Sequence, residues 1–295
     1  MTSSLSHMKF TFIGAGSMAE AIIRGLITKG GVHGENIFVI NRSNRARLEE
    51  LRERYGIRSS VNELEKDDAI RTGHIVVLAF KPKDALEGLS KIKHLIRPEQ
   101  LLVSVIAGLT IDTMQTLLDA ADYSIVRTMP NTSSTIGLGV TGMSFSPNVT
   151  PAGRQLAVQM FESAGIVSTV EEPLLDTITG VSGSGPAYIY YMMEAMIQGG
   201  VQGGLEPEEA RRLVVQTVLA LPVWYRPPGK ILPICAGRSL RLTGRLRPRW
   251  RRLIVTDSRK RSRRPCSAPP NAPVSWVRRS APPSLPKPSK VGVMQ

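Results

Sequence analysis

Two glycines and an alanine in the segment GAGSMA have the spacing of a phosphate-binding turn. Gly14, Gly16 and Ala19 occupy the G-x-G-x-x-A positions, after a short apolar run and before a stretch with helical spacing. The first glycine permits the tight turn, the second lets the backbone approach a pyrophosphate, and the small third residue lets helix and sheet pack closely. The free N–H groups of the helix then face the anion. The pattern favours a dinucleotide site over a purely structural turn, with the residues Ile13, Gly14, Ala15, Gly16, Ser17, Met18 and Ala19.

The end of the next apolar run bears on the choice between NADP(H) and NAD(H). A site selective for NAD usually has Asp or Glu there, which accepts from the ribose 2′-hydroxyl. This chain has Asn41, Arg42 and Ser43. Arg42 can pair with a 2′-phosphate, and the other two can donate to it. These residues favour NADP(H), with NAD(H) as the alternative; the competing interpretation treats Arg42, like Arg45 and Arg47, as a solvated charge at a helix start.

A third apolar run ends in the turn Ala79, Phe80, Lys81 and Pro82. Ligands of open α/β sheets bind beyond the carboxyl ends of the strands, so this rigid turn is predicted to line the cofactor. Taken alone, Lys81 is typical of a surface lysine.

The elements that must position these residues alternate from Met8 onward. KFTFIG, NIFVIN, HIVVLAF and QLLVSVIAG are short apolar runs, separated by segments with helical spacing. This alternation predicts an α/β fold, a Rossmann-like doubly wound parallel sheet over residues 8–172, preceded by an N-terminal extension at 1–7. YSIVRTM, GLGVTGMSF and IVSTVEE are the predicted later strands. Glycine-linked helices then predict the start of an all-helical domain at residues 173–220.

The last 75 residues differ sharply in composition from the rest of the chain. Residues 221–295 hold 18 Lys and Arg against one acid, with 13 of the 21 prolines and both cysteines, whereas residues 1–220 hold 20 Lys and Arg against 23 acids. A segment so rich in charge and proline is predicted to be disordered. Its arginines would bind nucleic acid non-specifically, through phosphates.

Other classes of protein find little support in the sequence. The histidines His7, His33, His74 and His94 are scattered without ligand spacing, and we predict no metal site. The start of the chain is unlike a secretory signal, and no apolar run approaches the ~20 residues of a membrane span. We therefore expect a cytoplasmic protein with no membrane partner.

Six segments, in order, resemble the pyrroline-5-carboxylate reductase family over about residues 8–220: GAGSMAEAIIRG, NRS, AFKPKD, SVIAGLT, VRTMPNT and SGSGPAY. MPNT and SGSGPAY together are far more specific than the glycine pattern. The resemblance implies an NAD(P)H-dependent reduction of the cyclic imine 1-pyrroline-5-carboxylate to L-proline. It also implies a Rossmann-like domain followed by a helical domain through which subunits form homo-oligomers.

The resemblance also implies where the small-molecule substrate binds. Ala107 and Gly108 would lie close to the nicotinamide, and the substrate pocket would be lined by Met129, Pro130, Asn131, Ser182, Gly183, Ser184 and Gly185. The catalytic residues stay unassigned: a protonated imine is already a good electrophile that requires no strong nucleophile or metal, so catalysis would come mostly from positioning. YIYYMMEAM (188–196) is interpreted as helix core and subunit interface.

The resemblance ends abruptly after Ala220. The family continues with a Ser-Pro-Gly-Gly-Thr-Thr segment and dimerising helices that have no counterpart in residues 221–295. We interpret this aberrant tail as the product of a shifted reading frame rather than a nucleic-acid arm, which leaves the activity and the oligomer of this chain open. Two other functions remain: a β-hydroxyacid dehydrogenase, although residues 173–200 lack its lysine, and a catalytically inert NADP-binding or nucleic-acid-associated protein that uses the tail.

Overall fold

The computed structural model of the chain describes residues 5–225. Contacts divide the chain into a unit of residues 1–218 and a second unit that begins at residue 219. The sheet and the helices that cover it belong to the first unit. The basic tail lies almost wholly outside the described residues. The expectation that it is disordered therefore concerns residues outside the described range.

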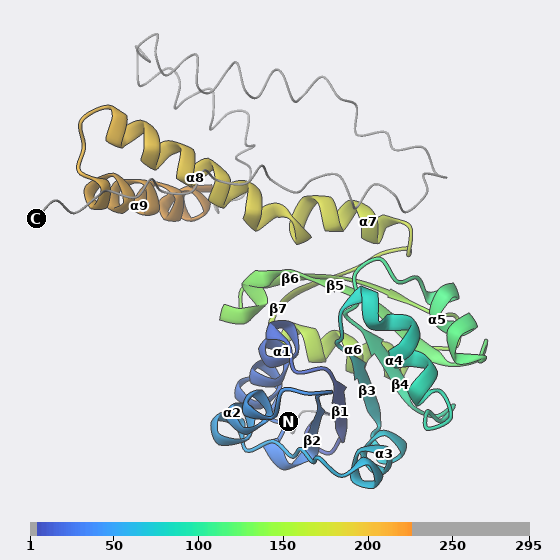
Figure 1. The fold of residues 1–295 in the computed structure, drawn as a ribbon. Coiled ribbons are helices and arrows are strands. Elements are labelled where there is room, and N and C mark those ends of the chain that lie inside the picture. Colours follow the sequence, from blue (N-terminus) through green and yellow to red (C-terminus); the bar gives the residue numbers. More distant parts are fainter. Residues whose placement is uncertain (1–4, 226–295) are drawn as a thin grey trace, which may run out of the picture. The chain divides into compact units, whose positions relative to one another are not determined.

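A seven-stranded sheet with the order β2-β1-β3-β4-β5-β6-β7 forms the centre of the first unit (Figure 1). Ile13 pairs with Ile40 on one side and Leu78 on the other, so the first three strands end level with one another. The strands are β1 (Phe10–Ile13), β2 (Ile37–Ile40), β3 (Ile75–Leu78), β4 (Leu101–Ser104), β5 (Ser124–Pro130), β6 (Gly139–Phe145) and β7 (Gly165–Thr169).

The sheet is parallel from β2 through β5, as predicted, but β6 runs antiparallel to β5 and β7 is parallel to β6. The expectation of a wholly parallel sheet is therefore wrong at this edge. A parallel crossover needs a dozen or more residues, usually with a helix. Residues 131–138 are too few, and they form only the 3₁₀ turn η3 (Thr132–Ile136) before the chain returns.

Helices cover both faces of the sheet, and each face has its own core. Side chains of α1 (Ser17–Thr28), α2 (Arg45–Tyr55) and α6 (Pro151–Glu162) pack on one face, against Phe12, Val39 and Val77. Side chains of α3 (Glu63–Thr72), α4 (Ala85–Ile92) and α5 (Ile111–Leu118) pack on the other, against Val76, Leu78 and Leu102 (Figure 1). Burial of two apolar layers holds the strand ends in place.

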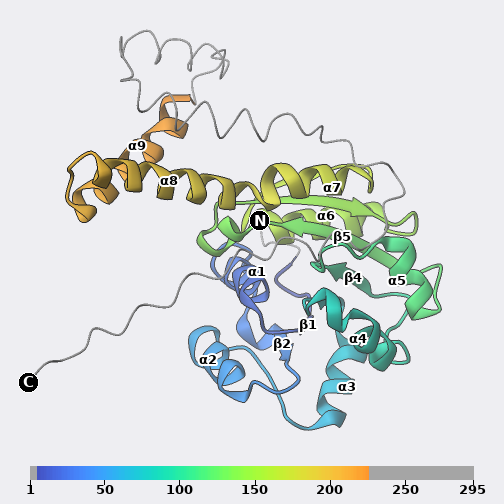
Figure 2. The same cartoon turned by 45° about the horizontal axis from the view of Figure 1, so that its top comes forward.

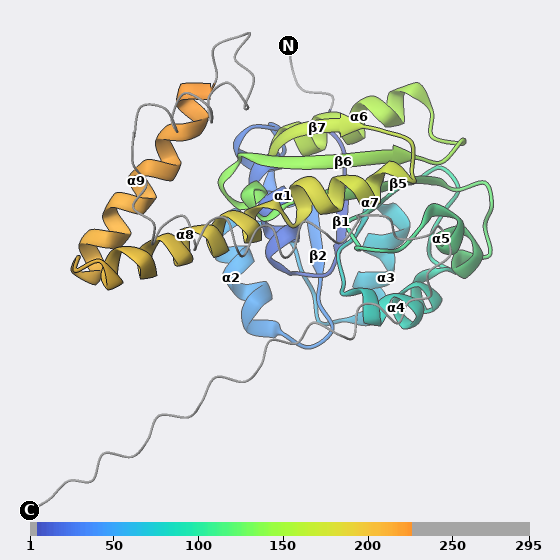
Figure 3. The ribbon, with the colours of Figure 1, turned by 90° about the horizontal axis from the view of Figure 1, so that it is seen from above.

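The helical part begins with α7 (Leu174–Ile178), which contacts β5 and β6, and the π-helical turn η4 (Thr179–Gly183). It continues as α8 (Gly185–Gln202) and α9 (Pro207–Tyr225), joined by a short turn (Figures 2 and 3). Pro207 begins α9, with Glu208 and Glu209 in its first turn. The predicted helical segment ends at residue 220, whereas α9 continues through Pro222 to Tyr225.

Candidate functional site

A cleft of about 1090 Å³ lies beyond the carboxyl ends of β1, β2 and β3. Most of the predicted cofactor residues line it. They come from three loops that the level strand ends bring together, and they are Ile13, Gly14, Ala15, Gly16, Ser17, Asn41, Arg42, Ser43, Ala79, Phe80 and Lys81. Met18 and Ala19 instead pack in the core beneath the loop, and Pro82 begins the 3₁₀ turn η2 (Pro82–Asp84).

The two loop glycines meet different demands. Gly14 has φ +121°, and a Cβ there would collide with the backbone carbonyl of Ala79. Gly16 has an ordinary φ of −74° and nothing within 4 Å of an added Cβ, so its backbone borders open space. It precedes α1, whose N-terminus has no side-chain cap. The first glycine is therefore needed for the turn, while the second leaves room for an anion at the helix N-terminus.

The loop after β2 is ordered by its own side chains. Asn41 Oδ1 accepts from the backbone N–H groups of Ser43 and Asn44, both at 3.2 Å. Arg42 is 70% exposed, and its guanidinium lies 3.8 Å from Asp84 and 3.9 Å from Glu87. Contacts this long between exposed groups contribute little, so the Arg42 charge remains available to a phosphate.

The loop after β3 and the start of α4 form the opposite side of the cleft. The ring of Phe80 lies against Gly88, where an added Cβ would come within 3.0 Å of it. Lys81, Lys83 and Lys91 also line the cleft. Asp84 and Glu87 line the same wall, and Lys91 pairs with Glu87 at 2.7 Å, which leaves Lys81 and Lys83 beside the aromatic ring for a flat, anionic ligand.

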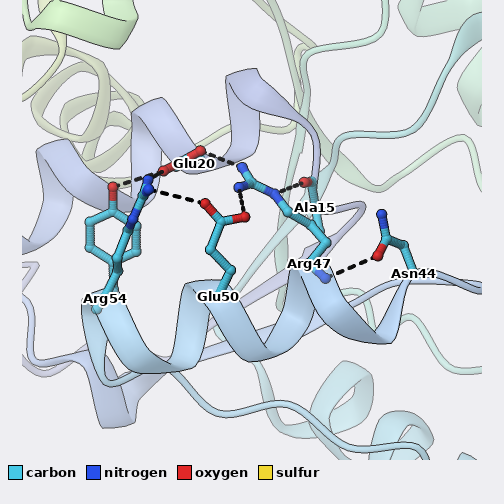
Figure 4. A network of polar contacts seen from close by, with 7 residues as sticks. Ala15, Glu20, Asn44, Arg47, Glu50 and Arg54 are labelled. Atoms are coloured by element: carbon cyan, nitrogen blue, oxygen red, sulfur yellow. Dashed lines mark hydrogen bonds and ion pairs between the residues drawn. The ribbon is translucent and has the colours of Figure 1, made fainter.

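A polar network beside the glycine loop was not predicted (Figure 4). The Nε of Arg47, on α2, donates to the Ala15 carbonyl at 3.1 Å. The two terminal nitrogens of the same guanidinium donate to Glu50, at 2.6 Å, and to Glu20 of α1. Arg54 and Tyr55 donate to the other oxygen of Glu20 at 2.9 and 3.0 Å. The interpretation of Arg47 as a solvated charge is wrong, since its side chain is only 19% exposed.

The network sets the charge states of its members. Partial burial alone would raise the pKa of Glu20, but the hydrogen bonds from Arg47 and Tyr55 outweigh it and hold that pKa below its ordinary value. Burial and the bond to Glu20 raise the pKa of Tyr55. The sequence signal for this network was Glu20, which lies in the first turn of the helix that follows the glycine loop. A carboxylate beside a phosphate subsite needs a cation.

The predicted substrate residues form a second group of contacts. Asn131 is buried after β5, and its Nδ2 donates to the Ser182 carbonyl at 3.1 Å, while its Oδ1 accepts from the Val140 N–H at 3.0 Å. A Cβ on Gly183 would lie 3.1 Å from the Met129 Sδ-methyl. The segments MPN and SGSG are thus brought together, with both polar atoms of the Asn131 side chain already engaged.

The remaining predicted residues lie at the ends of elements. Ala107 and Gly108 follow β4 and are exposed, and they do not line the cleft. Pro130 ends β5, while Ser184 and Gly185 begin α8 without a side-chain cap. An uncapped start of so long a helix favours a carboxylate.

A buried arginine joins the sheet to the helical part. Arg127 on β5 lies 3.1 Å from Glu172 and 3.3 Å from Asp176. Glu172 also accepts from the backbone N–H of Ile111, at the start of α5. These bonds fix α7, and with it the SGSG segment, against β5. An arginine within an apolar strand was the signal for a buried partner.

Helices α8 and α9 and the turn between them expose many large apolar side chains, namely Tyr188, Ile189, Tyr190, Tyr191, Met192, Val201, Leu205, Leu213, Val215, Leu219 and Leu221. Residues 188–196 are therefore not buried within the described chain, and their interpretation as a subunit interface stays a prediction. Rows of exposed apolar residues of this kind usually mark an interaction surface.

Within residues 5–225, no group of three or more His, Cys, Asp or Glu side chains is arranged to hold a metal ion. None of the described helices combines the length and the apolar character that crossing a membrane requires.

Two family models match the chain. Residues 9–108 match the model described as "NADP oxidoreductase coenzyme F420-dependent", and residues 172–224 match "Pyrroline-5-carboxylate reductase dimerisation". Among curated proteins, pyrroline-5-carboxylate reductase 2 of Bacillus subtilis is 41% identical over 210 residues, covering 71% of this chain and 74% of that protein. Pyrroline-5-carboxylate reductase 1 of the same organism is 42% identical over 221 residues, covering 74% and 72%.

Solved structures agree with these matches. A pyrroline-5-carboxylate reductase from Coxiella burnetii has a TM-score of 0.71 at 30% identity, covering 86% of this chain and 91% of that one. The Plasmodium falciparum pyrroline carboxylate reductase, solved with NADP bound, has a TM-score of 0.64 at 27% identity, covering 81% and 93%.

Proposed function

The chain belongs to the pyrroline-5-carboxylate reductase family, and we propose that it reduces the cyclic imine of 1-pyrroline-5-carboxylate to L-proline with NADP(H). Its fold and family make it an oxidoreductase of proline biosynthesis. The contact that joins Asn131 to Ser182 carries the proposal, because it brings together the two most specific segments of the family resemblance.

The cofactor cleft fits a dinucleotide with a 2′-phosphate. Gly16 leaves space where a Cβ would otherwise project, and α1 offers its uncapped N-terminus to the pyrophosphate. Arg42 and Ser43 hold the 2′-phosphate, since the loop has no carboxylate to repel it. NAD(H) is the weaker alternative, because it would leave Arg42 without its anion. When bound, the cofactor supplies the hydride.

The chain's own contribution to the chemistry is positioning. Asn131 holds η4 against β6, and Arg127 holds α7 against β5, so the start of α8 stays beside the ends of the strands. There the helix N-terminus and the Ser184 hydroxyl orient the carboxylate of the substrate. A protonated imine needs no nucleophile or metal, so alignment of the two reactants accounts for most of the acceleration.

We further propose that the working form is a homo-oligomer assembled through α8 and α9. The dimerisation model ends at residue 224, within α9, and the exposed apolar side chains of both helices lie inside the matched range. A second copy of the chain would cover them.

The test is to purify the full chain and to follow NADPH oxidation and proline formation with 1-pyrroline-5-carboxylate, with NADH in parallel. Imine-dependent proline formation, faster with NADPH, is the expected result. Tight NADPH binding without any proline would instead assign the chain to the inert NADP-binding class. Salt-resistant, sequence-selective binding of DNA or RNA would favour the nucleic-acid alternative.

A further inference from the structure

Glu20 is an unexpected residue in a phosphate-binding cleft. It lines the cleft and lies in the first turn of α1, the helix that begins beside Gly16. A dinucleotide with a 2′-phosphate brings several negative charges to this place. An uncompensated carboxylate there would repel these charges, because like charges repel one another strongly over the short distances of a partly closed cleft.

Arg47 is positioned to offset the negative charge of Glu20. Its guanidinium donates to three acceptors. They are the Ala15 carbonyl of the glycine loop, Glu20 of α1 and Glu50 of its own helix, α2. All three acceptors take a different nitrogen of the planar group, which fixes its orientation. Arg47 also lines the cleft.

The charges of the network balance. Two carboxylates, Glu20 and Glu50, are matched by Arg47 and Arg54, which also contact one another's partners. Removing Arg47 alone would leave one unbalanced negative charge on the cleft wall. It would also leave the Ala15 carbonyl without its side-chain donor, directly between the two loop glycines.

We propose that Arg47 is a positioning residue of the cofactor cleft, which offsets the charge of Glu20 and holds the glycine loop through the Ala15 carbonyl. This inference rests on the proposed use of NADP(H). The charge effect grows with the charge of the ligand, so Arg47 supports NADPH more than NADH. The loop effect acts on both cofactors equally, because both carry the same pyrophosphate.

The experiment compares Kd values for NADPH and NADH, by calorimetry, in the full chain and its variants. R47M should weaken NADPH about thirtyfold and NADH about fivefold, as the loss of one charge near several phosphates implies. R47K retains the charge and should weaken both cofactors by a similar, smaller factor. E20Q removes a negative charge from the cleft wall and should bind NADPH up to about threefold more tightly.

The double variant E20Q/R47M separates charge from structure. It should recover most of the NADPH affinity lost in R47M, to within about fivefold of the parent chain, because no unbalanced carboxylate remains. R52M is the matched control: Arg52 is on the same helix and carries the same charge, but it pairs only with the exposed Glu49 and does not line the cleft. Every variant shares the basic tail, so its own binding of anions cancels in the comparison.

The inference is overturned if R47M binds NADPH like R52M, or if E20Q fails to rescue R47M while thermal melting shows all variants folded. It is also overturned if NADPH and NADH lose affinity equally in R47M. Failure of the proposed function alone looks different: the variants would then rank as expected in NADPH affinity, but the parent chain would form no proline. Absence of all cofactor binding would overturn both proposals.

Discussion

The cofactor cleft and the helical pair α8–α9 are completed in different ways. Around the cleft, each loop is fixed by contacts within the described chain: Gly14 against Ala79, Asn41 within its own turn, Arg47 across two helices. Along α8 and α9, by contrast, large side chains such as Tyr190 and Leu213 are exposed. The cleft is self-contained, whereas the helices present a surface that they do not bury themselves.

The difference has a physical origin. A doubly wound sheet buries both faces under its own crossover helices, so the strand ends that carry the cofactor loops are ordered by one chain. Helices α8 and α9 meet beside the turn that joins them, where Gly200 lies against Ala210, and the apolar side chains farther along both helices stay open until another surface covers them. We therefore expect a single chain to bind the cofactor, whereas turnover requires the oligomer.

The largest effect is expected from substitutions in the exposed apolar surface of α8 and α9. Tyr191→Asp together with Leu213→Asp places two charges on α8 and α9, which should abolish self-association because burying unpaired charge is costly. Proline formation should fall at least about hundredfold through misplacement of the substrate segment, while the Kd for NADPH stays unchanged. Light scattering and a proline assay measure the two effects.

Val61→Asp is the matched control for this substitution. Val61 is exposed on the loop before α3 and does not line the cleft. This variant should keep both the oligomer and the turnover of the parent chain. Full turnover by a monomeric Tyr191→Asp/Leu213→Asp chain would break the division between binding and assembly.

The second effect tests the self-contained region through its two glycines. Gly14→Ala imposes a left-handed φ on alanine and a collision with the Ala79 carbonyl, so it should cost about 2 kcal/mol or more of stability and weaken NADPH binding at least tenfold. Gly16→Ala should keep the melting temperature, since its Cβ meets open space, yet weaken NADPH because the methyl group occupies the path of the pyrophosphate. Equal losses of stability in both variants would contradict this assignment.

Much of the cleft was predictable because its signals are local. The glycine spacing, the apolar strands and the Asn41 turn each depend on a few adjacent residues, and the level ends of β1, β2 and β3 follow from parallel pairing. The prediction of a wholly parallel sheet was wrong at β6, where the length of one loop decided the direction.

The unpredicted features depend on residues far apart in the sequence. Glu20 meets Arg47 across 27 positions, and Arg127 meets Glu172 across 45. Each residue alone is typical of a solvated helix face or an occasional strand charge, and only tertiary packing pairs it. The course of α9 through Pro222 was also not predicted, because proline inside a helix is locally a signal for the end of the helix.

A third effect, on stability, tests the boundary between the two regions. Arg127→Met should destabilise the chain by about 3 kcal/mol, because it leaves Glu172 partly buried without its cation. Asp176→Asn should cost less than about 1 kcal/mol, since the Asp176 side chain is 82% exposed. Urea unfolding measures both. Proline formation should fall further than NADPH affinity in Arg127→Met, and equal losses would place Arg127 in the cofactor region instead.

The smallest effect concerns acid. Burial raises the pKa of Glu20, but the bonds from Arg47 and Tyr55 outweigh it and keep the folded-state pKa below the ordinary 4.5. A carboxyl whose pKa is depressed by folding adds stability that is fully present above about pH 4.5 and is lost as the pH falls through its folded value. Glu20→Gln should therefore be about 1 kcal/mol less stable than the parent at pH 7. This gap should close in acid, whereas Glu49→Gln, which removes an exposed carboxylate of the neighbouring helix α2, should show a much smaller gap. A Glu20→Gln gap that stays constant from pH 7 to pH 3 would mean that Glu20 contributes through packing rather than charge.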